Sequence, residues 1–532
     1  MKRDAESNRT KIGAIMEKVS IIAVSCIGIL IFSVLTCYSA FYTQYYILSE
    51  EENILCKKDN WAGNIVCMLI CTAMFYVLWK YVLERIHNEK WKMRIFLAIV
   101  LIYIGGVCVF RIFITRSVPN SDPAMVYWAA RYFSIGTYDF MGPEGYLNLY
   151  PQQYGLIALY EMLFWIFRQN SYKLIQCMNA CCIVAAVFAG YHITNSWFEN
   201  KRINFYYLLL VSGCLPLFMY TTFVYGDIPA ITLALFMVWM FTLYCKKRHR
   251  LYLLSGVVFG VSAVLLKKNM LVVFIAVTII MAIYACKEKC YAGFLLCLVM
   301  FIAAGAADFG IKQIYEKRSG YEVGEGIPTI LWIAMGMQES KCGSGFYNAY
   351  NERTYIEAGY DGERASLMAY ESINERLAAF AAKPGQAVNF YARKFLSQWN
   401  VPSYQCFLES LTFEKEPSGF LKSLYFGRLY EKVLTIMDRY QFIIYAGGLL
   451  FAVCKRKKEY PVYVYILWTS IIGGVLFSLI WEAAGRYILP YFVFMIPYAA
   501  AGIYFLQEKI LGMAEKWKGR IEEKKQKAEK EV

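Results

Sequence analysis

The chain has 532 residues, of which 58% are hydrophobic and only 18% are charged, and its mean hydropathy is +0.39. This composition excludes an ordinary soluble globular protein and indicates a polytopic membrane protein. The formal net charge of +15 does not indicate nucleic-acid binding, because Lys and Arg gather in short segments between apolar runs, as the positive-inside rule describes.

Apolar runs recur along the chain, each near the roughly 20 residues that a bilayer requires. We expect an all-α polytopic fold with about 12 transmembrane helices. They fall at residues 19–42, 65–83, 95–115, 172–195, 205–222, 228–245, 251–266, 270–285, 290–309, 440–453, 462–481 and 487–506. The run at 154–167 has only about 14 residues, fewer than a span needs. It predicts a juxtamembrane or re-entrant helix.

Basic segments predict the sidedness of these helices. Lys and Arg are concentrated in residues 1–18, 85–94, 246–250 and 455–458. Because such segments stay in the cytoplasm, we expect a multi-pass protein of the cell membrane with both termini cytoplasmic. The loop that carries Asp122 then lies outside.

The same pattern divides the chain into five regions. Residues 1–93 comprise a cytoplasmic segment and two transmembrane helices, and residues 94–309 form a transmembrane core with an outer loop at 116–154. Residues 310–439 contain no run of membrane length and predict an α-rich, mixed extracytoplasmic domain, with a helix at 361–382 that Pro384 ends. The last spans at 440–507 and a charged cytoplasmic tail at 508–532 complete the chain.

The 17 cysteines carry little functional information, because most lie inside apolar runs, where cysteine behaves as a small hydrophobe. Their spacing with the three histidines does not match a zinc site, so we predict no metal ligands and no cofactor; a divalent metal is possible but has no support in the sequence. A disulfide between Cys342 and Cys406, both in the outer segment, has no support from spacing.

Several ionisable residues that are far apart in sequence should meet at the outer membrane face. They are Asp122, Asp227, Lys267, Lys268, Glu482 and Arg486. Ionisable residues near a membrane are expensive and are usually paired or functional. A carboxylate beside separate cations suits transfer from a phosphate leaving group, since the carboxylate deprotonates a hydroxyl and the cations stabilise the phosphate.

Each of these residues also has a purely structural alternative. Asp122 and Asp227 stand just before helix-like runs containing proline and could act as helix N-caps. The two lysines could extend to lipid headgroups, and Glu482 and Arg486 could pair with each other at i, i+4. The aromatic stripe that begins with Tyr127 is more typical of an interfacial belt than of a sugar platform.

Taken together, the motifs resemble those of polytopic glycosyltransferases of the C-type fold, particularly bacterial relatives of protein O-mannosyltransferases and of the lipid A aminoarabinose transferase. The resemblance covers most of residues 95–506. It rests on Asp122 with Tyr127 and Ala130, Tyr150-Pro151 with Tyr154, Asp227 after Leu215-Pro216-Leu217-Phe218, the lysines before Asn269, and Gly485-Arg486-Tyr487-Ile488-Leu489-Pro490. Pro123 stands where the family often has a second acid, and Pro151-Gln152 where it often has a Pro-Pro pair. Two spans precede the family's usual first helix.

The resemblance implies that Asp122 is a catalytic base and that Asp227 supports the site. It implies further that Lys268, with Lys267, and Arg486 contact a lipid phosphate, while Glu482, Tyr487, Tyr127 and Tyr150 support them. The expected activity is inverting transfer of a sugar from a polyprenyl-phosphate donor to a cell-envelope glycan, lipid or protein at the outer face of the membrane.

Two other functions fit a polytopic chain with a large outer segment. A surface-polysaccharide polymerase or ligase should depend on arginines of that segment, for instance Arg353, Arg364 or Arg376, more than on Asp122. A transporter or flippase should have repeat-related halves and charges at the membrane midplane. The ionisable residues here fall mainly near the outer boundary.

Overall fold

The computed structural model describes residues 2–48, 52–85, 89–143, 145–454 and 460–530, and most of them are helical. In this part of the chain nine helices are long and apolar enough to cross a membrane, or ten if one bent pair counts as a single span. The nine comprise α1 (Lys2–Phe41), α2 (Trp61–Leu78) with η1 (Trp79–Leu83), α3 (Glu89–Thr115), α7 (Tyr172–Phe198), α10 (Asp227–Lys247), α12 (Leu271–Glu288) with η5 (Lys268–Met270), α13 (Ala292–Ser319), α20 (Ile466–Ile480) with η6 (Val462–Tyr465), and α21 (Leu489–Lys530) with η7 (Gly485–Ile488).

The bent pair corresponds to the span expected at 205–222. It consists of α8 (Lys201–Ser212) and α9 (Leu215–Met219) with η4 (Tyr220–Thr222), which meet at an angle of 51°. Pro216 at the start of α9 explains the break, because a proline has no N–H to continue the helix. Two other expected spans are not among the nine: 251–266 is the shorter α11 (Arg250–Leu266), and 440–453 lies inside α19 (Arg428–Cys454).

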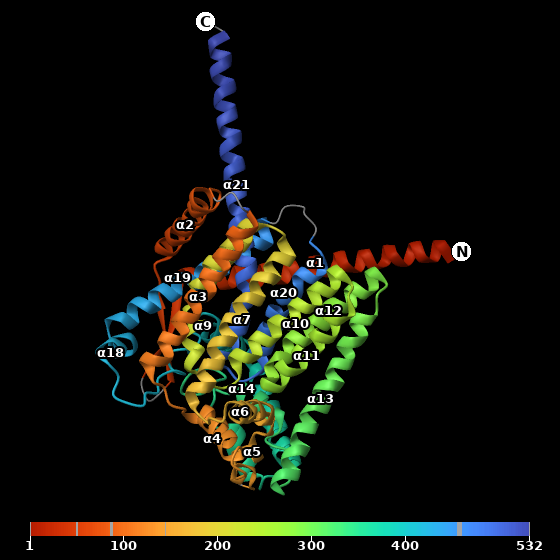
Figure 1. Ribbon diagram of the computed structural model, residues 1–532, viewed down its shortest axis with the longest axis vertical. Helices are drawn as coiled ribbons and strands as arrows, with labels where there is room; N and C mark the ends of the chain where they lie inside the picture. Colours follow the sequence, from red (N-terminus) through yellow and green to blue (C-terminus); the bar gives the residue numbers. More distant parts are fainter. Residues whose placement is uncertain (1, 49–51, 86–88, 144, 455–459, 531–532) are drawn as a thin grey trace.

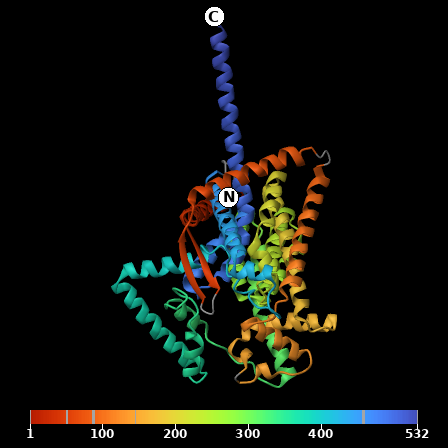
Figure 2. The same ribbon diagram turned by 90° about the vertical axis from the view of Figure 1, so that its left-hand side faces the viewer.

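The first two long helices are joined by a β-hairpin that the sequence analysis did not predict. Strands β1 (Tyr42–Leu48) and β2 (Glu52–Lys58) pair antiparallel, with Tyr42 opposite Lys58. Figure 2 shows the hairpin running down beside the bundle and α2 lying across one end of it. α1 is anchored to the C-terminal helices, since Phe32 stacks on Trp468 with ring centroids 4.7 Å apart.

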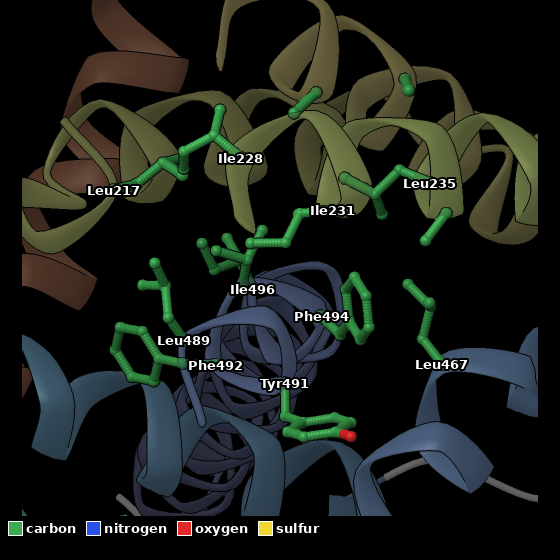
Figure 3. Close-up of a cluster of buried hydrophobic side chains, with 14 of the residues drawn as sticks. Leu217, Ile228, Ile231, Leu235, Leu467, Leu489, Tyr491, Phe492, Phe494 and Ile496 are labelled. Atoms are coloured by element: carbon green, nitrogen blue, oxygen red, sulfur yellow. The ribbon is translucent and has the colours of Figure 1, made fainter. Parts of the chain in front are cut away.

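The buried core joins the middle of the chain to its last helices. In Figure 3, side chains of α9 and α10 face side chains of α20 and α21 across a continuous apolar contact. The labelled members are Leu217, Ile228, Ile231, Leu235, Leu467, Leu489, Tyr491, Phe492, Phe494 and Ile496. This packing fixes the start of α10 relative to the start of α21, the two places where candidate residues lie.

Short helices gather at the opposite end of the bundle from the projecting C-terminal part of α21 (Figure 1). The outer loop forms α4 (Ser121–Phe133), η2 (Asp139–Met141), α5 (Tyr146–Leu149), η3 (Pro151–Gln153) and α6 (Tyr154–Phe167). The segment expected to be an outer domain contributes α14 (Thr329–Gly336), α15 (Tyr350–Glu357), α16 (Gly362–Ala382) and α17 (Pro384–Trp399), while its α18 (Gly419–Phe426) lies at the side of the bundle (Figure 1).

The expected helix at 361–382 is confirmed as α16. The side chain of Asp361 caps it by accepting from two backbone N–H groups, and Pro384 starts a new helix. The outer segment does not have the expected edges, because α13 continues to Ser319 and α19 already begins at Arg428. It also packs on the outer loop, since Leu149 and Tyr150 contact its small apolar core.

Candidate functional site

The first element of the site is the start of α4, which presents Asp122. The helix is capped by Asn120, whose side chain accepts from the backbone N–H of Ser121, so the capping role proposed for Asp122 belongs to its neighbour. The Asp122 carboxylate is half-buried and accepts a hydrogen bond of 3.1 Å from the hydroxyl of Tyr225. Asp122 therefore faces the segment just before α10.

Tyr225 connects several parts of the site, and sequence reasoning missed it. Its hydroxyl accepts from the side-chain amide of Gln153 at 2.9 Å and lies 3.3 Å from the hydroxyl of Tyr146. The outer loop and the α10 start are thus held together by one buried phenol. The only sequence signal was its position two residues before Asp227.

Asp227 opens α10 and forms a buried ion pair with Lys267. Gly226 is the N-cap with φ +84°, and a Cβ there would lie 2.8 Å from the carbonyl oxygen of Leu266, so glycine lets the two helix ends approach. Lys267 Nζ lies 3.1 Å from Asp227 Oδ2, and the two side chains are only 13% and 5% exposed. N-capping is not the role of Asp227 either.

Lys267 also links this pair to Tyr225. Its ammonium donates to the Tyr225 carbonyl oxygen at 3.3 Å and lies 4.1 Å from the centroid of the Tyr225 ring. Burial lowers the pKa of Lys267, while the adjacent Asp227 carboxylate opposes that change.

Arg486, on η7 at the start of the last long helix, supplies the second cation. Its Nη1 lies 3.2 Å from Glu409 Oε1, and its guanidinium lies 5.5 Å from the Tyr225 ring centroid. Its Nε is buried and has no hydrogen-bond partner among the described residues. Glu409 was not among the candidate residues, because nothing in its local sequence distinguishes it.

Glu482 does not form the i, i+4 ion pair with Arg486 that was one alternative. The chain between them is not a regular α-helix, and the Glu482 carboxylate instead accepts from the hydroxyl of Tyr487 at 2.9 Å. Glu482 is 6% exposed, and burial raises its pKa. Tyr487 also stacks beside Arg486, with the guanidinium 5.4 Å from its ring centroid.

Three other candidates point elsewhere. Lys268 pairs with Asp308 of α13 at 2.7 Å, so Lys267 rather than Lys268 enters the cluster. The hydroxyl of Tyr127 donates to the carbonyl oxygen of Asn170 at 3.0 Å, inside an aromatic group. The hydroxyl of Tyr150 donates to Glu352 of the outer segment.

The arginines that the polymerase alternative favours are not assembled into a comparable cluster. Arg353 donates to the carbonyl oxygen of Asn348, and Arg376 donates to the carbonyl oxygen of Met337. Arg364 is exposed on α16.

Two further expectations concern ligands and cross-links. Within the described ranges, no three His, Cys, Asp or Glu side chains are grouped so that they could hold a metal ion. Cys342 and Cys406 are not joined to each other, so the disulfide considered between them does not form.

Residues 19–502 match the model of a family described as "Conserved hypothetical integral membrane protein". The search of curated proteins returned no match. The match covers most of the chain, including every candidate residue named above.

Proposed function

The chain belongs to this family of integral membrane proteins, and we propose, from the geometry of the site, that it acts at the membrane as a glycosyltransferase that uses a polyprenyl-phosphate sugar. The acceptor in this proposal is a hydroxyl of a cell-envelope glycan, lipid or protein. Transfer takes place at the outer face of the cell membrane, with both termini in the cytoplasm, α11 and α19 also crossing, and about 12 spans in total.

One observation carries the proposal: a carboxylate and two cations from separate stretches meet around a single tyrosine. Asp122 accepts from the Tyr225 hydroxyl, while Lys267 and Arg486 lie 4.1 Å and 5.5 Å from the Tyr225 ring centroid. A base and a phosphate-binding cation placed this close together are what the reaction needs.

The reaction follows from these positions. The Asp122 carboxylate takes the proton of the acceptor hydroxyl, whose oxygen forms a bond to the anomeric carbon from the face opposite the leaving group. The bond from that carbon to the phosphate oxygen breaks, and its electron pair stays on the polyprenyl phosphate. Arg486 stabilises this charge, assisted by Lys267, and inversion results.

Each of the two cations is held in place by a carboxylate. Asp227 holds Lys267 and Glu409 holds Arg486 at 3.1 Å and 3.2 Å. A phosphate that binds Arg486 can accept from Nε, which has no hydrogen-bond partner among the described residues. The guanidinium can therefore bind it without giving up Glu409.

The test measures transfer of radiolabelled sugar from polyprenyl-phosphate hexoses and pentoses by purified protein, with a cell-envelope extract as acceptor. Asp122→Asn should lower transfer roughly 10²–10⁴-fold, the range for loss of a general base. Asp139→Asn is the matched control, because Asp139 is an exposed carboxylate of the same loop. Its transfer should equal that of the wild type.

Other outcomes would redirect the assignment. Equal transfer by Asp122→Asn and wild type removes Asp122 from its role and favours a polymerase or ligase that uses outer-segment arginines. Absence of transfer with every donor contradicts the reaction class and favours transport.

A further inference from the structure

A groove runs along the outside of the molecule where α6, α13 and the end of α4 meet. Its volume is about 730 Å³, within the range of roughly 300–1,000 Å³ that is usual for ligand sites. It begins near Ser134, the C-cap of α4, which is about 18 Å along that helix from Asp122. This α6–α13 groove is therefore separate from the proposed catalytic site.

The walls of the groove are apolar and face outward. Trp165 and Met162 of α6 are 80% and 49% exposed, and Ile314 of α13 is 56% exposed. α13 is one of the helices that can cross a membrane. Figure 1 shows α6 nearly end-on while α7 and α13 run along the picture, so α6 lies across the bundle. Such a helix, with an exposed tryptophan, is typical of the membrane interface.

Two arginines line the groove, and within the described part of the chain only one of them is paired with a carboxylate. Arg318 is neutralised by Glu161, with Nη2 2.5 Å from Oε1 and Nη1 3.1 Å from Oε2. Arg168, the left-handed C-cap of α6, has no ion pair among the described residues. The groove thus combines apolar walls with one uncompensated positive charge at the end of α6.

From this arrangement we propose that the α6–α13 groove binds an anionic phospholipid. The lipid phosphate pairs with Arg168, and one acyl chain lies along Met162, Trp165 and Ile314. Charge complementarity selects an anionic headgroup. The nearby Glu161 carboxylate is already paired with Arg318, so it does not repel an anion that binds Arg168. This site rests on the membrane location of the protein and not on the glycosyltransferase proposal.

The test counts lipids retained by the purified full-length protein in native mass spectrometry and measures their affinities. Phosphatidylglycerol and phosphatidylcholine with the same acyl chains are titrated separately. Wild type should bind one phosphatidylglycerol more tightly than phosphatidylcholine. Arg168→Gln should weaken that binding about fivefold, the effect of one cation beside an anionic lipid, and Arg168→Lys should largely keep it.

The matched control is Lys173→Gln. Lys173 is an exposed cation at the start of α7, close in sequence to Arg168, but it does not line the groove. Its substitution should leave phosphatidylglycerol binding unchanged. Ala158→Phe, which narrows the groove itself, should weaken both lipids.

Three results would overturn the proposal. The first is equal affinity of the wild type for both lipids, and the second is unchanged phosphatidylglycerol binding in Arg168→Gln. The third is an equal loss in Arg168→Gln and Lys173→Gln, which would show a general effect of surface charge. None of these readouts depends on sugar transfer.

Discussion

The buried pair of Lys267 and Asp227 makes the sharpest prediction about how the site is held together. Lys267→Met removes the cation that faces a carboxylate only 5% exposed. Breaking a buried ion pair by removing one partner usually costs about 3–5 kcal/mol, because the remaining charge stays buried without compensation. The ammonium over the Tyr225 ring, 4.1 Å from its centroid, places Lys267→Met toward the upper end of that range.

The pair should be coupled, so the double variant is informative. Asp227→Asn alone leaves the Lys267 ammonium buried without its carboxylate. Asp227→Asn combined with Lys267→Met leaves neither of these two positions charged. We expect the double variant to be destabilised less than the sum of the two single variants, with a coupling energy of about 2–3 kcal/mol. The free energy of unfolding is measured in mixed micelles titrated with SDS and followed by circular dichroism.

The neighbouring lysine provides the control. Lys268 is 37% exposed and pairs with Asp308 at the edge of the bundle. An ion pair that solvent reaches this well contributes less than about 1 kcal/mol. If Lys267→Met is no more destabilising than Lys268→Met, the idea that Lys267 and Asp227 form a desolvated pair is wrong.

Two further predictions concern the framework around the site. Burial lowers the pKa of Lys394 from 10.5 to about 7, so between these values the unfolded chain binds a proton that the folded protein lacks. The free energy of unfolding should therefore rise as pH increases from about 7 toward 10.5. Lys394→Met should flatten this pH dependence, which is measured by thermal unfolding between pH 7 and 9. An unchanged pH dependence in the variant would contradict the lowered pKa of Lys394. At the crossing of α19 and α21, a Cβ on Gly502 would lie 1.9 Å from the carbonyl oxygen of Gly447. Gly502→Ala should lower the free energy of unfolding by about 3 kcal/mol and lower the unfolding midpoint. Gly512→Ala is the control and should leave the midpoint unchanged, because a Cβ there meets open space. Equal midpoints for the two variants would show that the helix crossing relaxes.

Most long helices could be read from the sequence because their signal is local. The apolar run expected at 172–195 is α7, which starts at the expected residue and ends three residues later, at Phe198. The run expected at 95–115 ends with α3 at Thr115. The end of α16 was equally accessible, because Pro384 follows it closely in the sequence.

Pairings across long sequence distances could not be read in this way. Arg486 was a candidate from its own motif, but Glu409, its partner, lies 77 residues earlier in a segment without a distinctive pattern. Tyr225 and Asp122 are 103 residues apart. The choice of Lys267 over Lys268 depends on where α11 ends, at Leu266, which turns adjacent side chains in different directions. Helix boundaries at this accuracy are beyond sequence patterns.

The hairpin between the two N-terminal helices, which have no counterpart in the resemblance, packs beside the segment that leads into Arg486. Their connecting hairpin carries Tyr46, which is 2% exposed and packs in a small apolar cluster with Phe346 and Ala483. The Tyr46 hydroxyl lies 3.2 Å from the position that a Cβ on Gly485 would take. The backbone carbonyl oxygen of Tyr46 accepts a hydrogen bond of 2.9 Å from the Tyr430 hydroxyl. Since Gly485 directly precedes Arg486, the hairpin packs against the backbone that leads into Arg486. The hairpin between the first two helices therefore supports the segment that carries this cation.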